Sequence, residues 1–296
     1  MSIKSVEFSI NGQSYTLDLD SSTGKYKKTI TAPNTTSWGE TDHKYATQLK
    51  VTDVAGNVTT IDKDNSSFGE KMLLRVLEKV APVISITSPS SGAYLGSNSV
   101  KVEFTVTDSG SGVDPDTIKL QIDSGSTVTS GITKTEITNG YKCTYTATCA
   151  DGSHTVKVDA SDNDGNAATQ KSASFTVDTV PPELNITSPE DILITNAQSL
   201  TVSGSTNGSC TIAITLNGTD QGTVSLTNNT FSKTVTLAKG SNVLIITATD
   251  KAGKVTTVQR EVTYDPVAPV IVSIDLTPNP VAAGSTFTVT VEATDE

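Results

Sequence analysis

The stretch VAPVISITSP, residues 80–89, decides the fold, because it recurs as VPPELNITSP at residues 180–189 and in shorter form as VAPVI at residues 267–271. Successive copies lie about 100 and about 90 residues apart, which is the size of one small β-sandwich domain. Proline fixes φ and has no N–H, so each copy suits a stiff link into an edge strand. The repeat predicts these boundaries: module 1 at 1–80, module 2 at 81–179, module 3 at 180–266 and a partial module at 267–296.

A second phrase recurs ahead of each boundary and predicts a β-hairpin. It reads VTDVAGNVT at 51–59, ASDNDGNAA at 160–168 and ATDKAGKVT at 248–256. Each copy lies between two alternating apolar runs, and its Asp-x-x-Gly tip supplies the positive φ of a short loop. No segment shows a sustained helical period. We therefore expect an all-β fold of tandem immunoglobulin-like β-sandwich domains in an elongated array, with this hairpin joining strands F and G.

The composition fits half-buried strands and argues against several classes of function. Hydrophobic residues are 35% of the 296 residues and aromatic residues only 5%, so the core must be built from Val, Ile and Leu. The formal net charge of −11 repels phosphate backbones, so we expect no nucleic-acid partner. No run of about 18 apolar residues occurs, so we expect no membrane insertion. Met1 to Ser9 lacks the apolar region of a signal peptide, which predicts synthesis in the cytoplasm unless an export signal was removed.

The linker and hairpin phrases resemble the bacterial Ig-like domain families along the whole length of the chain. Such modules occur in bacterial surface adhesins and in the virion proteins of tailed phages. The opening IKSV at residues 3–6, the NGQ at 11–13 and the ending TPNPVAAG at 277–284 look more like Ig-like proteins encoded among the tail genes of phages of Gram-positive gut bacteria. The resemblance implies display, spacing or binding rather than catalysis.

Module 1 is predicted to lack its first two strands. Module 3 contains ITLNG at 214–218 and FSKTVT at 231–236, and module 1 contains FSING at 8–12 and YKKTIT at 26–31 in the same order. In module 3 these stretches follow strands A and B, which occupy about residues 183–204. Module 1 is therefore expected to begin near strand C.

The C-terminal end of the sequence carries two predicted strands of the kind that module 1 is expected to lack. Pro269 to Thr277 predicts a strand A and Thr286 to Ala293 a strand B, and an isolated strand pair is marginal at best. One hypothesis is that this pair completes module 1 of another copy by strand addition, giving head-to-tail fibres or a ring. The alternative is that module 1 is complete in its own way, with the insertion from Asp62 to Leu74 as an edge, and that the last strand pair belongs to a truncated module.

We predict that the chain is not an enzyme, because no catalytic arrangement of residues occurs. Cys143 and Cys149 fall on one expected strand and lie roughly 20 Å apart, too far for a disulfide, and Cys210 belongs to another module. Three reduced thiols are expected. His43 and His154 have no Cys, Ser or second His at the spacing of a triad or a zinc site, so both are interpreted as surface histidines.

Calcium is the one cofactor that the sequence suggests, because clustered carboxylates supply the oxygen ligands that Ca²⁺ prefers. One cluster follows strand B of module 2, and a second joins the F–G region of module 2 to the next linker. Their members are Asp108, Asp114 and Asp116 in the first, and Asp159, Asp162, Asp164 and Asp178 in the second. The alternative is turn chemistry, in which each Asp caps its own bend. Linker one carries Glu78 where linker two carries Asp178, which argues against one mechanism at every joint.

An aromatic loop in module 1 is the candidate for sugar contact. Trp38 and Tyr45 flank or lie in the insertion from Pro33 to Lys44. An exposed aromatic loop can stack on carbohydrate, and it can equally form the lid of a small core.

Three functions are compatible with the sequence. The leading hypothesis is a virion structural protein: a phage tail or fibre component whose partners are other copies of itself, other virion proteins or host surface glycans. The alternative is a bacterial adhesin or cell-wall spacer at the extracellular surface. The third is an accessory region of a carbohydrate-active enzyme.

Overall fold

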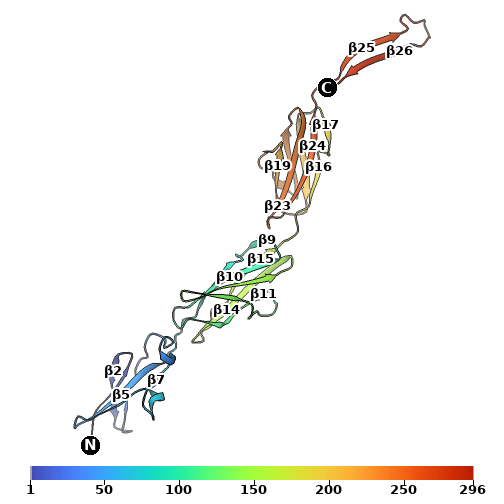
Figure 1. The fold of residues 1–296 in the computed structure, drawn as a ribbon. Coiled ribbons are helices and arrows are strands. Elements are labelled where there is room, and N and C mark those ends of the chain that lie inside the picture. Colours follow the sequence, from blue (N-terminus) through green and yellow to red (C-terminus); the bar gives the residue numbers. More distant parts are fainter. Residues whose placement is uncertain (1, 296) are drawn as a thin grey trace. The chain divides into compact units, whose positions relative to one another are not determined.

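The computed structural model describes residues 2–295, and these are almost entirely β (Figure 1). Only two short 3₁₀ helices interrupt the strands, η1 (Thr41–His43) and η2 (Gly69–Met72). No helix in the described part of the chain is long and apolar enough to cross a membrane. The chain divides into two compact units, one of residues 1–93 and 97–177 and one of residues 94–96 and 178–296. The all-β prediction is confirmed.

Module 3 is a complete sandwich of two facing sheets. One sheet has the order β16-β18-β22-β21 (strands A, B, E and D), and the other has the order β17-β24-β23-β19-β20 (A′, G, F, C and C′). Their core side chains include Val202, Ile214 and Leu244, all fully buried. The strands are β16 (Leu184–Ser188), β17 (Leu193–Thr195), β18 (Ser199–Thr206), β19 (Cys210–Leu216), β20 (Thr219–Asp220), β21 (Leu226–Thr227), β22 (Thr230–Thr236), β23 (Gly240–Asp250) and β24 (Val255–Tyr264).

Module 2 has the same architecture, and tandem immunoglobulin-like sandwiches are therefore confirmed. Its sheets have the orders β12-β13-β10-β8 and β11-β14-β15-β9. Cys143 lies in the core opposite Phe104 as a free thiol, and desolvation raises its pKa to about 11. The strands are β8 (Val83–Ser88), β9 (Ala93–Leu95), β10 (Ser99–Thr107), β11 (Val113–Ile122), β12 (Thr133–Ile137), β13 (Gly140–Thr148), β14 (Gly152–Asp162) and β15 (Lys171–Val177).

Module 1 consists of one main sheet and a separate hairpin. The sheet order is β2-β1-β5-β6, which matches strands C′, C, F and G of module 3, and the hairpin β3–β4 stands where strands D and E would be. Among residues 2–295, no strand takes the place of A or B in this module. The strands are β1 (Ile3–Ile10), β2 (Gln13–Thr16), β3 (Asp18–Asp20), β4 (Lys25–Lys27), β5 (Tyr45–Asp53), β6 (Val58–Ile61) and β7 (Leu73–Leu74).

The insertion in module 1 interrupts strand G and does not replace A or B. β6 pairs with the second half of β5, at residues 49–52, and β7 pairs with its first two residues. Residues 62–72, which include η2, lie between these two short pieces of the same edge. The insertion therefore adds to the edge of the main sheet and supplies no strand of a second sheet.

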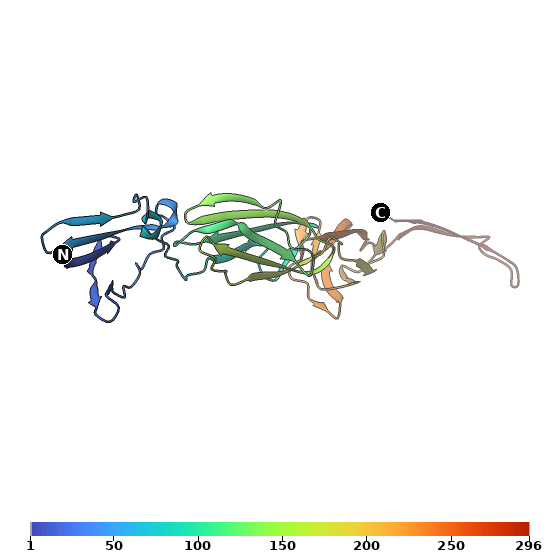
Figure 2. The ribbon, with the colours of Figure 1, turned by 90° about the horizontal axis from the view of Figure 1, so that it is seen from below.

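The last segment forms a hairpin of two strands, β25 (Val270–Thr277) and β26 (Thr288–Thr294), which pair antiparallel with one bulge. Neither view of the ribbon places another layer of strands against this pair (Figures 1 and 2). Every residue of both strands is exposed. The strand positions lie within two residues of the expected strands A and B.

The three F–G hairpins share one turn design, as the sequence predicts. Gly56, Gly165 and Gly253 have φ of 90°, 92° and 79°, and each donates its N–H to the carbonyl oxygen of the Asp three residues earlier, at 3.2 Å. This is a type I turn that ends on a left-handed glycine. The Asp side chain then accepts the N–H of the residue after the glycine, at 2.8 Å in modules 1 and 3 and 2.7 Å in module 2.

The third hairpin departs from the other two at one side-chain contact. In modules 1 and 2 the residue after the glycine is Asn57 or Asn166, whose amide also donates to the second carboxylate oxygen of the Asp, at 2.8 and 2.7 Å. Module 3 has Lys254 there, and Asp250 Oδ2 is buried without a hydrogen-bond partner in the described residues. A buried acceptor without a donor destabilises a fold.

Replacing Lys254 by Asn should stabilise module 3 by about 1 kcal/mol, because the amide can satisfy Asp250 Oδ2. Hydrogen exchange of the full chain measures this as slower opening of the β23 and β24 amides. The reciprocal control, Asn57→Lys, should speed opening of β5 and β6. Equal exchange in wild type and Lys254→Asn would contradict the explanation.

Candidate functional site

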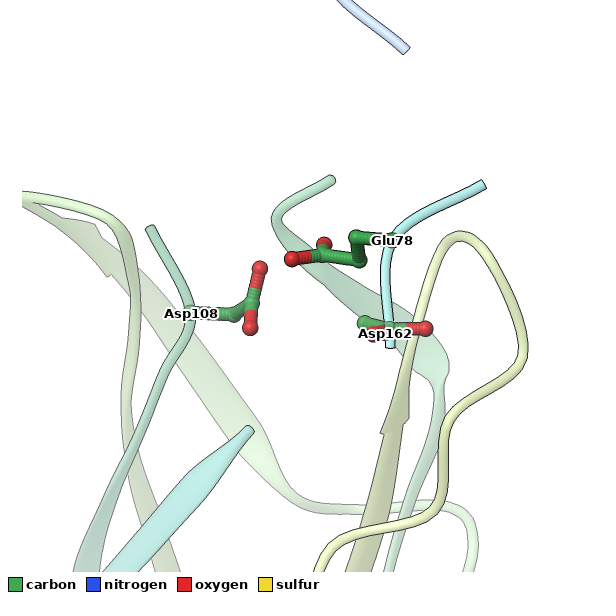
Figure 3. A group of neighbouring side chains, drawn as sticks. All are labelled: Glu78, Asp108 and Asp162. Carbon is green, nitrogen blue, oxygen red and sulfur yellow. The ribbon is translucent and has the colours of Figure 1, made fainter. Parts of the chain in front are cut away.

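Two of the seven predicted calcium ligands meet, and they meet a residue outside the predicted set. Asp108 follows β10, Asp162 ends β14, and Glu78 lies in the linker before module 2 (Figure 3). One carboxylate oxygen of each lies within 4.8 Å of the others. The three carboxylates come from three segments that sequence reasoning kept apart. The sequence does contain a feature that could have identified Glu78 as a ligand. It lies four residues before Pro82, just as the predicted ligand Asp178 lies four residues before Pro182.

Backbone turns hold the three carboxylates in place. Asp108 Oδ1 accepts the N–H groups of Gly110 and Gly112, both at 2.9 Å. Asp162 belongs to the F–G turn described above and also accepts the N–H of Asp164 at 3.0 Å. Glu78 accepts the N–H of Ser111. Hydrogen bonds from backbone N–H groups therefore fix the orientation of each of the three side chains.

The cluster concentrates negative charge in a poorly hydrated place. Asp108 is 6% exposed and Asp162 is 2% exposed. Among the described residues, the ion pairs of 4 Å or less include none of these three carboxylates, and the nearby Arg75 pairs with Asp164 instead. Buried carboxylates at this spacing repel one another unless a cation or a proton compensates them. A set of oxygen ligands alone suits Ca²⁺ better than Zn²⁺.

Asp164 fastens module 1 and the linker to module 2 inside the first unit. Its side chain is 1% exposed, and Oδ2 accepts the hydroxyl of Thr36 at 2.6 Å and the N–H of Glu78 at 3.0 Å. Arg75 lies 3.5 Å from Oδ1. Burial works to raise the pKa of this carboxyl, but the hydrogen bonds from Thr36 and Glu78 and the charge of Arg75 outweigh burial and lower the pKa. We call these four residues the Asp164 joint.

The other predicted ligands lie apart from this cluster. Asp114 accepts the N–H of Asp116 at 3.0 Å, as in the turn-chemistry alternative, and Asp159 accepts two hydrogen bonds from Gln170. The suggested grouping of Asp178 with Asp162 is wrong, because β15 runs the length of the sandwich. Val177 pairs with Gly152 at the start of β14, whereas Asp162 is at its end. Asp178 instead accepts the N–H of Val180 in its own linker, at 3.3 Å.

Module 3 does not repeat the acidic cluster. The A–B registers of the two modules align with an offset of 100 residues, since Ile86 pairs with Phe104 and Ile186 pairs with Gly204. Asp108 therefore corresponds to Gly208, which has no carboxylate. Among the described residues, a cluster of this kind therefore occurs only where the first linker meets module 2.

The histidines and aromatic residues have structural roles. His154 lies between the Asp123 carboxylate and the Ala150 carbonyl oxygen, 2.8 Å from each. Tyr45 is a buried core residue of module 1 that hydrogen-bonds Thr35 at 2.6 Å. Trp38 is half-buried, and its ring stacks on His43 with centroids 3.8 Å apart. The loop thus packs as a lid on module 1, and its use for sugar contact stays a prediction.

Family models match most of the chain in three segments. Residues 2–70 and 79–179 match models described as bacterial Ig-like domain, and residues 182–265 match a model described as glucodextranase, domain B. A search of curated proteins finds no match.

Solved structures with similar folds include two from unrelated proteins. The fibronectin(III)-like modules of Clostridium thermocellum CbhA are 14% identical, over 62% of this chain and 94% of that chain, with a TM-score of 0.40. An I-band fragment of titin is 13% identical, over 89% of this chain and 88% of that chain, with a TM-score of 0.40. By the family models, the chain contains two bacterial Ig-like domains, in modules 1 and 2. By its strand order, module 3 is a third sandwich of immunoglobulin-like topology.

The stability of module 2 should fall as pH rises through the folded-state pKa of His154. Hydrogen bonds to Asp123 and Ala150 raise that pKa above the usual value of a histidine, 6.5. The contribution is therefore fully present below the unfolded pKa and is lost above the folded pKa. NMR titration of the ring should give a raised pKa in wild type and a lower one in Asp123→Asn. Urea unfolding at pH 6 and pH 8 should differ less in His154→Gln, and an unchanged difference would rule out this histidine as the cause.

Proposed function

We propose that this chain is a non-enzymatic structural and adhesive protein, a tail or fibre component of a phage that displays or binds at the bacterial surface. Its Ig-like domains support the structural or adhesive role. The finer assignment rests on the resemblance of residues 3–13 and 277–284 to tail-encoded Ig-like proteins. The single observation that supports a structural role is the Asp164 joint, which ties two modules into one compact unit.

The joint is suited to keep the first two modules from moving independently. A linker without side-chain contacts leaves neighbouring domains free to reorient. Here a nearly buried carboxylate takes a hydroxyl from the 33–44 loop, an N–H from the linker and an arginine contact from the end of module 1. Because the group is buried, each of these hydrogen bonds is costly to break. A spacer or fibre needs this property, and a catalyst does not.

Calcium would strengthen the same joint. The cluster of Glu78, Asp108 and Asp162 joins the linker to two loops of module 2, so a cation bound there would fix the linker to the module. Ca²⁺ would relieve the repulsion among the three carboxylates and accept further oxygen ligands from carbonyl groups or water. Asp108 and Asp162 would be ligands from module 2, and Glu78 would be the ligand from the linker.

Adding Ca²⁺ should raise the unfolding temperature of the first unit, since a ligand at about 100 times its Kd stabilises a fold by about 2.7 kcal/mol. Calorimetric titration should show one site that is weakened at least about tenfold by Asp108→Asn or Glu78→Gln, changes that keep an acceptor for the backbone but remove a charge. Asp116→Asn removes an equal charge from an exposed residue and should bind as wild type does. Calcium binding that is absent, or equal in all four proteins, would exclude this site.

The phage assignment predicts where the protein is found. Gold-labelled antibodies against the chain should decorate the tails of particles released after phage induction in the strain that encodes it. Labelling of the surface of uninduced cells would support the adhesin or wall spacer instead. Labelling of neither would contradict both assignments.

A second candidate function is favoured by the match of residues 182–265 to glucodextranase domain B. That match supports an accessory region of a carbohydrate-active enzyme. Such a region would be encoded beside a catalytic domain, and co-sedimentation of the chain with insoluble α-glucan would favour it. Binding to isolated cell walls but not to α-glucan would favour the surface-binding role.

A further inference from the structure

The β25–β26 hairpin has one wholly apolar face and one polar face. Its register pairs Ile274 with Val291, Leu276 with Val289 and Ile271 with Ala293, so these six side chains share a face. The five larger ones are 41–61% exposed. The opposite face carries Ser273, Asp275, Thr277, Thr288, Thr290 and Glu292. This alternation is that of a sheet with one side buried, yet no described residue covers it.

The same hairpin is covered where it occurs inside a complete module. In module 3, β16 and β18 pair with a bulge at Ile186 and Ser188, opposite Gly204 and Ser203. In the last segment the bulge lies opposite Ala293 and Glu292, which aligns Val291 with Val202. Val202 is fully buried beneath the second sheet. The β25–β26 hairpin therefore has the register of strands A and B without the sheet that normally faces them.

Module 1 has the opposite deficiency. Its sheet places Phe8, Leu49 and Val51 on the face that corresponds to the core of module 3. On the same face Val6 and Ile10 are buried, at 5% and 3% exposure. The three side chains between and beside them are only half-buried, whereas the corresponding Ile214, Ile246 and Ala248 are fully buried. The layer that covers the latter three is the β16-β18-β22-β21 sheet. Among the described residues of module 1, no sheet of four strands takes that position, and Val76 packs on the same face at the end formed by Ile10 and Tyr45.

An unpaired backbone edge accompanies the uncovered face. In module 3, β22 pairs with β18 over residues 230–236. The matching stretch of module 1 is YKKTIT, residues 26–31, but its ladder ends at Lys27. In the described part of the chain, residues 28–31 belong to no strand. The sequence of a strand E is present, and within residues 2–295 no strand B pairs with it.

The two surfaces also match in charge and size. In the B–E register of module 3, Ser203 pairs with Ser232 and Gly204 with Phe231. The same register would place Glu292 opposite Lys27 and the small Ala293 opposite the ring of Tyr26. Residues 267–296 contain four acidic residues and no basic one, whereas the edge beside them would carry Lys25, Lys27 and Lys28. Lys27 and Lys28 pair with Asp20 and Asp18 of their own hairpin and would exchange or share these partners. Opposite charges across strands favour the pairing.

We propose that the β25–β26 hairpin of one copy supplies strands A and B to module 1 of a second copy, with β26 added to the edge formed by residues 26–31. The hairpin buries its apolar face on Phe8, Leu49 and Val51, and module 1 gains its second sheet. Each copy uses its hairpin on one neighbour and its module 1 on the other, so assembly continues head to tail or closes into a ring. This inference goes beyond the proposed function, because it requires neither calcium nor a virion.

The first test is the mass of the full chain in solution as a function of concentration, measured by light scattering. Wild type should form species heavier than a monomer as concentration rises. Val291→Lys puts a charge on the apolar face and should stay monomeric. Thr290→Lys adds the same charge one residue away, on the polar face, and should assemble as wild type does. A monomeric wild type at every concentration up to the solubility limit, or equal assembly by Val291→Lys, would overturn the proposal.

The second test fixes the register and the identity of the partner. One protein carries Lys27→Cys and the other carries Glu292→Cys, and the two are mixed and oxidised mildly. Residues opposite each other on paired strands have Cα atoms about 5 Å apart, within reach of a disulfide. A covalent dimer that forms only in the mixture is expected, and Lys27→Cys mixed with Asp275→Cys should give none. A double variant that cross-links only within one chain would show self-closure and refute assembly between copies.

Discussion

A β-sheet with one apolar face is stable only when a second layer removes that face from water, and every feature of this chain follows from how that requirement is met. The cores are built mainly from Val, Ile and Leu, with single phenylalanines such as Phe104 and Phe231 among them. Modules 2 and 3 satisfy the requirement with two facing sheets, and their central side chains are fully buried. Module 1 and the last hairpin each provide one layer. The apolar face of the hairpin is exposed, and in module 1 Phe8, Leu49 and Val51 are only half-buried.

The polar groups act at the ends of the sandwiches, where strands turn and linkers begin. There the aspartates first serve the backbone: Asp53, Asp162 and Asp250 each close an F–G turn. Only in module 2 does a second acidic loop meet this turn, and only there does the linker add a carboxylate. The F–G turn of module 2 is thus part of a candidate cation site, because Asp108 and Glu78 add two carboxylates beside Asp162. The same end of module 2 holds the Asp164 joint, so the buried acidic cluster and the contacts between modules 1 and 2 lie close together.

The sequence predicted the elements whose signals are local. Proline phrases marked the linkers, and the Asp-x-x-Gly tips marked the hairpins, because both depend on backbone conformations that few residues adopt. The spacing of Cys143 and Cys149 along one strand was enough to exclude a disulfide between them. Comparison of the modules with one another also predicted the last two strands. Their apolar and polar residues alternate regularly, as in strands A and B of module 3.

Contacts between distant segments were beyond the sequence alone. Grouping aspartates by proximity in sequence joined Asp178 to Asp162, although strand G carries them to opposite ends of module 2. The same grouping by sequence separated Asp108 from Asp162 and omitted Glu78. These three residues lie on three different segments, which come together only when the two sheets of module 2 pack. The sequence by itself determined the strands, their turns and the module order, which follow from local backbone preferences and alternation. Only the tertiary structure decided which charges meet and which apolar faces stay uncovered, because both depend on how the sheets are layered.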